Sequence, residues 1–177
     1  MKKLLLHTCC GPCAIYVAQK LKEDYDVTLF FYNPNIYPRE EYEKRLNEIK
    51  RWSQKENIEL IEGEFNQDDW FGKVKGLEKE PEGGARCAVC YKLRLKKTAK
   101  YAERNSFDVF TTTLTISPHK KAEIINPIGL KLGKDYEFEF IEADWKKQEG
   151  FKIACELSHQ EGFYRQTYCG CKYSIRE

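Results

Sequence analysis

The chain has 177 residues, enough for one domain with a substantial core, and 41% of them are hydrophobic. The formal net charge is only +2, so any surface that binds nucleic acid must be local. No apolar run approaches the length of about 18 residues that marks a membrane span, and the apolar stretch Leu4 to Leu6 is too short for a secretory signal. These features favour a cytoplasmic protein with a single domain over 1–177.

Strands and helices are predicted to alternate along the chain. Apolar, β-branched and aromatic runs indicate five strands, at 3–7, 26–32, 58–61, 107–112 and 136–141. Helical spacing indicates helices at 13–24, 40–56, 67–77, 87–105, 117–132 and 147–159. The second helix has an expected inward stripe of Tyr42, Leu46, Ile49 and Trp52. Pro127 is expected to kink or interrupt the fifth.

This alternation predicts an α/β fold, Rossmann-like, with a mainly parallel five-stranded sheet and helices on both faces. A cysteine-rich tail, 162–177, follows it. Ligands of such folds bind beyond the carboxyl ends of the strands, where the strand order reverses. The loops 7–13 and 113–115, after the first and fourth strands, are therefore expected to be neighbours at the functional site.

Seven of the eight cysteines gather in three short segments, namely Cys9, Cys10 and Cys13; Cys87 and Cys90; and Cys169 and Cys171. In a reducing compartment such clusters bind metal or act catalytically more often than they form disulfides. Cys10-Gly-Pro-Cys13 is spelled like the redox motif of thioredoxins, but dithiol exchange leaves the other cysteines without a role. Cys155, unpaired within the last predicted helix, is expected to be a small core residue.

The two later pairs admit two interpretations. Cys87 and Cys90 share one face of a first helical turn, where anionic ligands are stabilised. With Cys169 and Cys171 they can form a structural zinc site of four thiolates, which leaves Cys9 and Cys10 unexplained. Alternatively, four thiolates hold an iron–sulfur cluster and the surplus thiolates hold a second iron.

Basic and aromatic residues suggest contacts with RNA. One predicted helix is basic, through Lys92, Arg94, Lys96, Lys97 and Lys100, either as a solvated face or as phosphate contacts. Tyr164, Arg165 and Tyr168 combine a planar cation with stacking surfaces, as single-stranded or displaced bases require. The tyrosines can equally well pack the tail onto the domain. His7, which leads into the first cysteine loop, is either a proton donor or a packing residue.

Five motifs together resemble the epoxyqueuosine reductase QueH family. They are H-T-C-C-G-P-C at 7–13, N-P-N-I at 33–36, C-x-x-C-Y-x-L-R at 87–94, T-T-L-T-I-S-P at 112–118 and Y-R-Q-x-Y-C-G-C-x-Y-S at 164–174. The resemblance runs from end to end of the chain. It implies a fold like that of the adenine-nucleotide α-hydrolases, in which thiols replace the phosphate loop after the first strand.

The resemblance also implies an oxidoreductase that reduces epoxyqueuosine in tRNA to queuosine with two electrons and without cobalamin. It implies a [4Fe–4S] cluster and an adjacent mononuclear iron. The implied metal ligands are Cys9, Cys10, Cys87, Cys90, Cys169 and Cys171, with Cys9 and Cys10 catalytic; Cys13 is the least certain member. The expected substrate contacts are Arg94, Lys96, Lys97, Tyr164, Arg165 and Tyr168. The partners are tRNA and an electron donor that the sequence does not identify.

Two other functions remain open at this level. A tRNA sulfur-transfer enzyme on the same fold uses ATP and a Ser-Gly-Gly-x-Asp-Ser loop after the first strand, and that loop is absent here. A non-catalytic zinc protein that holds RNA accounts for one set of four thiolates. Metal analysis separates the iron–sulfur and zinc interpretations.

Overall fold

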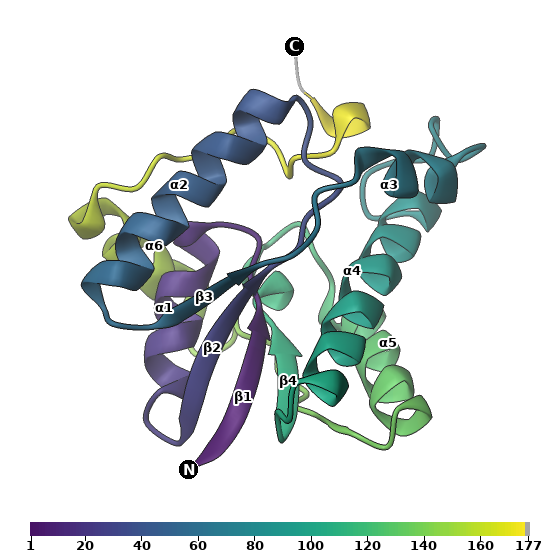
Figure 1. Cartoon of the computed structure of the whole chain (residues 1–177). Helices are drawn as coiled ribbons and strands as arrows, with labels where there is room; N and C mark the ends of the chain where they lie inside the picture. Colours follow the sequence, from purple (N-terminus) through teal and green to yellow (C-terminus); the bar gives the residue numbers. More distant parts are fainter. Residues whose placement is uncertain (176–177) are drawn as a thin grey trace.

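The computed structural model describes residues 1–175, which fold around a parallel sheet (Figure 1). Within this range the sheet has five strands in the order β3-β2-β1-β4-β5. Their bounds are Lys2–His7 for β1, Tyr25–Phe31 for β2, Glu59–Glu62 for β3, Val109–Thr112 for β4 and Glu139–Phe140 for β5. All four pairings are parallel, so the predicted five-stranded parallel sheet is confirmed. The strand order reverses between β1 and β4.

Six helices flank this sheet in the described part of the chain. They are α1 (Gly11–Leu21), α2 (Arg39–Lys55), α3 (Gln67–Val74), α4 (Ala85–Arg104), α5 (Ala122–Asp135) and α6 (Gly150–Glu161), with 3₁₀ turns η1 (Leu114–Ile116) and η2 (Lys172–Ser174). Figure 1 shows α1, α2 and α6 on one side of the sheet and α4 and α5 on the other. None of these helices is long and apolar enough to cross a membrane.

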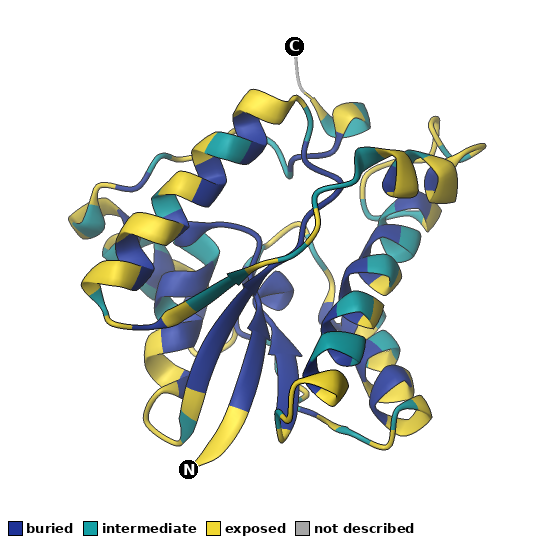
Figure 2. Ribbon diagram, viewed as in Figure 1, coloured by how far each residue is buried: buried dark blue, intermediate teal, exposed yellow. Residues whose placement is uncertain are grey.

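Two apolar layers hold the helices to the sheet, because alternate side chains of a strand point to opposite faces. Leu4 and Leu6 pack in the layer of α1, α2 and α6, while Leu5 packs in the layer of α4 and α5. All three leucines are fully buried, and β1 and β2 are dark blue in Figure 2 beyond their first two residues. The predicted inward stripe of α2 is also buried, namely Tyr42, Leu46, Ile49 and Trp52.

Two predicted boundaries were clearly wrong, and one predicted helix break is absent. The helix predicted from Ser117 begins at Ala122, because the chain first forms the η1 turn and a turn around 117–120. Pro127 lies inside α5 and does not interrupt it, since a proline removes one hydrogen bond while the helix stays anchored by its buried face; a kink at Pro127 stays a prediction. The fifth strand is only Glu139–Phe140, because its pairing with β4 ends there. The last two positions of the predicted tail 162–177 lie outside the described residues.

Candidate metal centre

Three thiols meet where β1 ends. The strand stops at His7 and α1 begins at Gly11, so the loop and the first helical turn carry all three cysteines. The Sγ atoms of Cys9, Cys10 and Cys13 all lie within 4.8 Å of one another. The Sγ atom of Cys9 also lies 3.9 Å from Oγ1 of Thr113, so the predicted neighbourhood of the two loops is confirmed. Three such thiols can hold a soft metal ion; we call them the triad.

Hydrogen bonding divides the triad into unlike thiols. The Cys10 thiol, followed by the Cys13 thiol, holds the pKa of Cys9 well below its usual value, although burial opposes this. The same contacts, first with Cys10 and then with Cys9, raise the pKa of Cys13. The triad therefore offers one ready thiolate at Cys9, which is the form that binds metals.

The other two cysteine pairs meet in a second cavity. Cys87 and Cys90 come from the first turn of α4, and Cys169 and Cys171 come from the tail. All four line a narrow cavity of about 20 Å³; we call them the quartet. Within residues 1–175 the triad alone forms a group of three or more ligand atoms spaced within 4.8 Å, so the quartet is the more open set.

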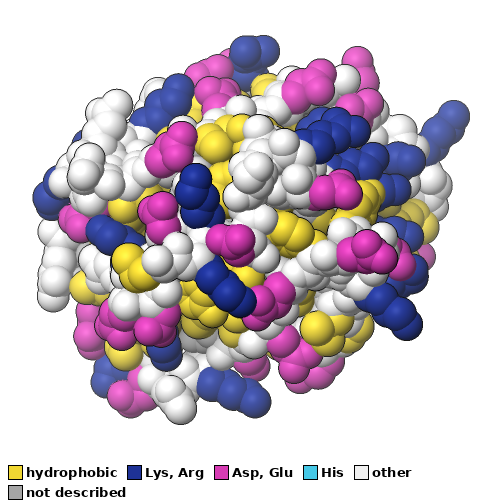
Figure 3. Space-filling view, turned by 60° about the horizontal axis from the view of Figure 1, so that its bottom comes forward, with side chains coloured by type: hydrophobic (Ala, Val, Ile, Leu, Met, Phe, Trp, Pro, Cys, Tyr) yellow, Lys and Arg dark blue, Asp and Glu magenta, His cyan; other side chains and the backbone are white. Residues whose placement is uncertain are grey.

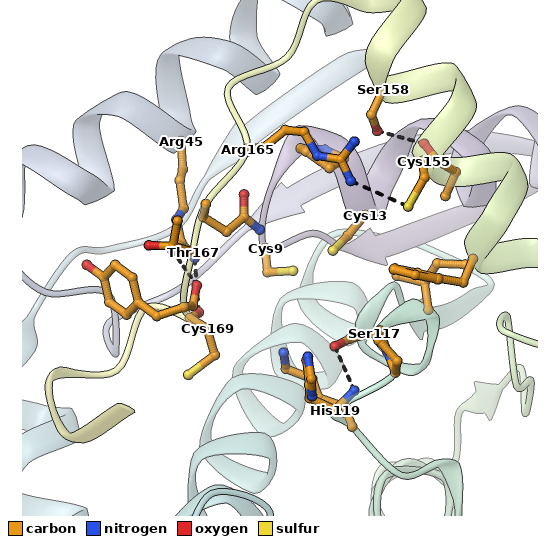
Figure 4. Close-up of a pocket in the computed structure, with 18 of the residues that line it drawn as sticks. Cys9, Cys13, Arg45, Ser117, His119, Cys155, Ser158, Arg165, Thr167 and Cys169 are labelled. Carbon is orange, nitrogen blue, oxygen red and sulfur yellow. Dashed lines mark hydrogen bonds between the residues drawn. The ribbon is translucent and has the colours of Figure 1, made fainter. Parts of the chain in front are cut away.

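The two sulfur sets adjoin. Cys169 lines the quartet cavity and also a larger cavity of about 230 Å³, whose walls include Cys9 and Cys13. Figure 4 shows Cys9, Cys13 and Cys169 around this larger cavity, with His119 across from them. The predicted gathering of the three cysteine segments is thus present as two neighbouring sets rather than one.

Arg45 of α2 fixes the tail beside these cavities. Its Nη1 and Nη2 atoms donate hydrogen bonds of 2.9 Å to the carbonyl oxygens of Cys169 and Tyr168. Its Nε atom donates to Glu41 at 2.9 Å, and both side chains of this ion pair are buried. Such a paired and hydrogen-bonded charge can stay in the interior. This role was not predictable from the sequence, because Arg45 is one of many charged residues on α2.

Comparisons with known proteins identify the family of the chain. The family model described as "Epoxyqueuosine reductase QueH" matches residues 4–177. The chain belongs to this family. A QueH-family reductase of Acinetobacter baylyi is 42% identical, with 99% of this chain and 81% of the relative covered. One of Streptococcus pyogenes is 37% identical (98% and 70% covered), and one of Thermotoga maritima is 33% identical (100% and 92% covered).

Solved structures share the fold at low sequence identity. A predicted subunit of a tRNA methyltransferase from Methanocaldococcus jannaschii has a TM-score of 0.58 at 13% identity, with 86% of this chain and 76% of that chain covered. The U34-tRNA thiolase NcsA from Methanococcus maripaludis, solved with its [4Fe-4S] cluster, has a TM-score of 0.60 at 14% identity, with 99% and 62% covered. These two likenesses establish the fold, and the predicted likeness to adenine-nucleotide α-hydrolases is confirmed.

The tail residues expected to contact the QueH-family substrate fall into two groups: two tyrosines that are hydrogen-bonded to the domain, and one exposed arginine. The hydroxyl of Tyr164 donates to Glu41 at 3.0 Å, and the hydroxyl of Tyr168 donates to the carbonyl oxygen of Tyr37. These two tyrosines therefore anchor the tail, which is the packing interpretation. Arg165 is exposed and lines the larger cavity, so its substrate contact stays a prediction.

Cys155 is not the core residue that the sequence predicted. Its side chain is partly exposed, lines the larger cavity and accepts a hydrogen bond of 3.5 Å from Nη2 of Arg165. The reason is its position on α6, where the neighbouring Ala154 and Ser158 occupy the buried face.

The basic helix α4 is only partly a solvated face. Lys96 is exposed, and Lys97 is half-buried with its Nζ atom 5.7 Å from the ring centre of Tyr32. Arg94 is buried, and its Nη1 atom donates to Oδ1 of Asn33 at 3.2 Å. An exposed phosphate contact at Arg94 is therefore excluded, because four residues from Cys90 it lies on the inward face of the helix. Figure 3 shows charges of both signs interspersed over the face that it draws.

His7 has the packing role rather than that of a proton donor. Its Nδ1 atom lies 2.9 Å from Oγ1 of Thr112, and its Nε2 atom lies 3.1 Å from the carbonyl oxygen of Tyr32. Burial lowers the pKa of His7 to about 4, so the ring is neutral near pH 7. Both ring nitrogens are thus occupied inside the fold.

Three residues beside the two cavities were missed by sequence reasoning. Gln166 donates a hydrogen bond of 3.0 Å from Nε2 to the Sγ atom of Cys10. His119, on the loop between η1 and α5, lines both cavities. Lys120 lines both as well, and its charge contributes to the lowered pKa of Cys9. The only sequence signal for His119 and Lys120 was their place soon after the fourth strand, and the only one for Gln166 was its place in the tail motif 164–174.

Proposed function

We propose that this protein is an epoxyqueuosine reductase that acts on tRNA without cobalamin. In the reaction the epoxide takes up two electrons and two protons, both carbon–oxygen bonds break, a carbon–carbon double bond forms and the oxygen leaves as water. Family membership across residues 4–177 supports the substrate and the reaction. The observation that carries the proposal is the convergence of three cysteine segments on two adjoining cavities.

The donor set fits an iron–sulfur cluster with a second iron. The quartet offers the four thiolates that a [4Fe–4S] cluster takes, from the first turn of α4 and from the tail that Arg45 fixes. The triad is spaced tightly enough for one soft metal ion. We therefore assign the cluster to the quartet and the mononuclear iron to the triad. When bound, these groups supply electrons one at a time and Lewis acidity toward the epoxide oxygen.

The larger cavity is the proposed place of the modified base. Its volume of about 230 Å³ opens between the triad, the loop at 117–120 and the tail. A base can reach it only if the nucleotide is displaced from its stack, as in other enzymes that act on bases. Arg165 at this cavity offers a planar cation on which a base can stack. Gln166 holds Cys10 in place from the same segment.

His119 is the proposed proton donor. Its imidazole lines both cavities, and no hydrogen bond of its ring is present among residues 1–175. Histidine is the side chain suited to giving up a proton near neutral pH. A ring nitrogen of His119 can then protonate the departing oxygen. Lys120 lines the same cavity, and its positive charge stabilises negative charge there. His7 is excluded because both its ring nitrogens are occupied.

The proposed partners are tRNA and a separate electron donor. Lys96 and Lys97 on α4 can contact phosphates, and Arg165 can contact the displaced base. We place the protein in the cytoplasm, where tRNA is modified.

The test is metal analysis followed by turnover. Protein purified without oxygen should contain iron and inorganic sulfide, and should convert epoxyqueuosine-tRNA to queuosine-tRNA with a chemical reductant and no cobalamin or ATP. Zinc without sulfide, together with no conversion, would contradict the proposal and favour the zinc interpretation. A requirement for ATP with sulfur incorporation would favour the transferase.

A further inference from the structure

Arg94 is a buried cation that lacks a carboxylate partner. Its side chain is 3% exposed, and its hydrogen-bond partner is the neutral amide of Asn33, at 3.2 Å. The Nε atom of Arg94 has no partner, and Arg94 forms no ion pair, in the part of the chain that the structure describes. A charged group that is buried away from water without an ion pair or a full set of hydrogen bonds strongly destabilises the folded state.

Arg45 shows how the same fold treats another buried cation. Arg45 is equally buried, but it pairs with Glu41 at 2.9 Å and donates to two carbonyl oxygens. The contrast indicates that the environment of Arg94 is incomplete without an anionic group.

Four thiols share the quartet cavity with Arg94, and Glu82 also lines it without forming an ion pair with Arg94 in the part of the chain that the structure describes. Arg94 lines the quartet cavity and lies one helical turn beyond Cys90. Burial works against its charge, but Cys90 and Cys9 outweigh burial and raise the pKa of Arg94. Cys169 contributes in the same direction. Arg94 therefore shares a cavity with the quartet thiols, and the charge of Cys9 from the triad also acts on it.

We propose that Arg94 is the buried counter-charge of the thiolate-bound metal centre and stabilises its reduced form. The inference rests on the proposed function, and it makes Arg94 a positioning residue rather than a catalytic one. Each added electron makes a thiolate-bound centre more negative. A fixed cation in a medium of low dielectric stabilises that form more than the oxidised form. Loss of the charge should therefore make the centre harder to reduce.

Three variants test this role in the anaerobic holoprotein. Arg94→Gln removes the charge, Arg94→Lys keeps it, and Arg104→Gln removes an equal charge from an exposed position about 15 Å further along α4. The readouts are iron, sulfide and the midpoint potential from a titration followed by electron paramagnetic resonance. For Arg94→Gln we expect reduction at least tenfold less favourable, about 59 mV for one electron, or loss of the centre. Arg94→Lys and Arg104→Gln should keep both the centre and its potential.

Two outcomes overturn the inference. One is a wild-type potential in Arg94→Gln. The other is an Arg94→Lys protein that loses the centre as Arg94→Gln does, since shape rather than charge would then be decisive. A wild-type protein that holds no iron and sulfide would overturn the cofactor assignment itself, so the two failures are distinguishable.

Discussion

Among single residues, Cys13 is the one whose proposed role as a metal ligand the structure strengthens most. One helical turn beyond the loop, it was the least certain ligand in the sequence, yet its Sγ atom lies within 4.8 Å of those of Cys9 and Cys10. We expect Cys13→Ser to lose about one iron per chain and most turnover while retaining sulfide, because a hydroxyl is a poorer ligand than a thiolate for a soft metal.

Iron and sulfide analysis checks this expectation. Cys155→Ser is the matched control, since Cys155 lines the same cavity but lies outside the triad. It should keep both elements. A Cys13→Ser protein with its full iron content would remove Cys13 from the ligands.

His119 is also considered as a single residue, because its proposed role is to donate one proton. We expect His119→Gln to lower the turnover rate about 100-fold near neutral pH, the lower range for loss of a general acid. Activity that depends on a general acid falls as pH rises, and this fall should vanish in the variant. The pH–rate profile is the measurement, and Lys121→Gln on the same loop, outside both cavities, is the control. An unchanged profile in His119→Gln would assign the proton to another group.

At the scale of helices and strands, hydrophobic periodicity predicted which side chains face the core, because the local sequence determines this. The inward stripe of α2 is buried as predicted, because the helix period determines which side chains face the core. The position of the tail was not predictable in this way. It depends on contacts such as that of Arg45 with Cys169, whose partners are far apart along the chain and carry no periodic signal.

The tail itself depends on Gly170. This glycine has a φ of +115°, and a Cβ atom there would lie 3.0 Å from Cγ1 of Ile36 and 3.1 Å from Nη1 of Arg45. We expect Gly170→Ala to lower the free energy of unfolding by more than about 1 kcal/mol and to release sulfide, because both strain and crowding disturb the Arg45 contact. Urea denaturation and sulfide analysis measure the two effects.

Gly162→Ala provides the control for backbone strain alone. Gly162 also has a positive φ, +73°, but nothing lies within 4 Å of its added Cβ atom. This variant should lose stability without losing sulfide. Equal effects of the two substitutions would show that crowding at Gly170 is irrelevant.

Helix α4 provides the element-scale test of RNA binding. Each phosphate contact removed should flatten the dependence of log affinity on log salt by about one unit. We expect this for Lys96→Ala, since Lys96 is exposed, and weaker tRNA binding at low salt. Lys134→Ala at the far end of α5 should leave the slope unchanged. Identical slopes for wild type and Lys96→Ala would identify this side chain as merely solvated.

At the scale of the whole molecule, the sheet topology brings distant cysteines together. The reversal between β1 and β4 places the loop 8–10 beside Thr113, as predicted from the general rule for ligand sites of parallel α/β sheets. The division into a triad and a quartet could not be predicted, because it depends on how α4 and the tail pack beside that edge. The exposure of Cys155 and the burial of Arg94 were missed for the same reason.

This arrangement predicts that the proposed metals and the tail stabilise each other. The tail supplies Cys169 and Cys171 to the quartet, whereas β1 and β2 are held by two apolar layers that contain no tail cysteine. Ligands that bind only the folded form stabilise the segments that hold them. Removal of the metals should therefore loosen the tail first and leave the sheet intact.

Hydrogen exchange of holoprotein and metal-free protein measures this effect. Amides between 162 and 175 should lose protection on metal removal, while those of β1 and β2 should keep theirs, because local opening requires less free energy than global unfolding. A second variant, Glu41→Gln, removes the ion pair that holds Arg45 against the tail. Its tail amides should be less protected in the metal-free state than in the holoprotein. Equal loss of protection across the whole chain would mean that the metals stabilise the fold globally, and no loss in the tail would separate Cys169 and Cys171 from the metal centre.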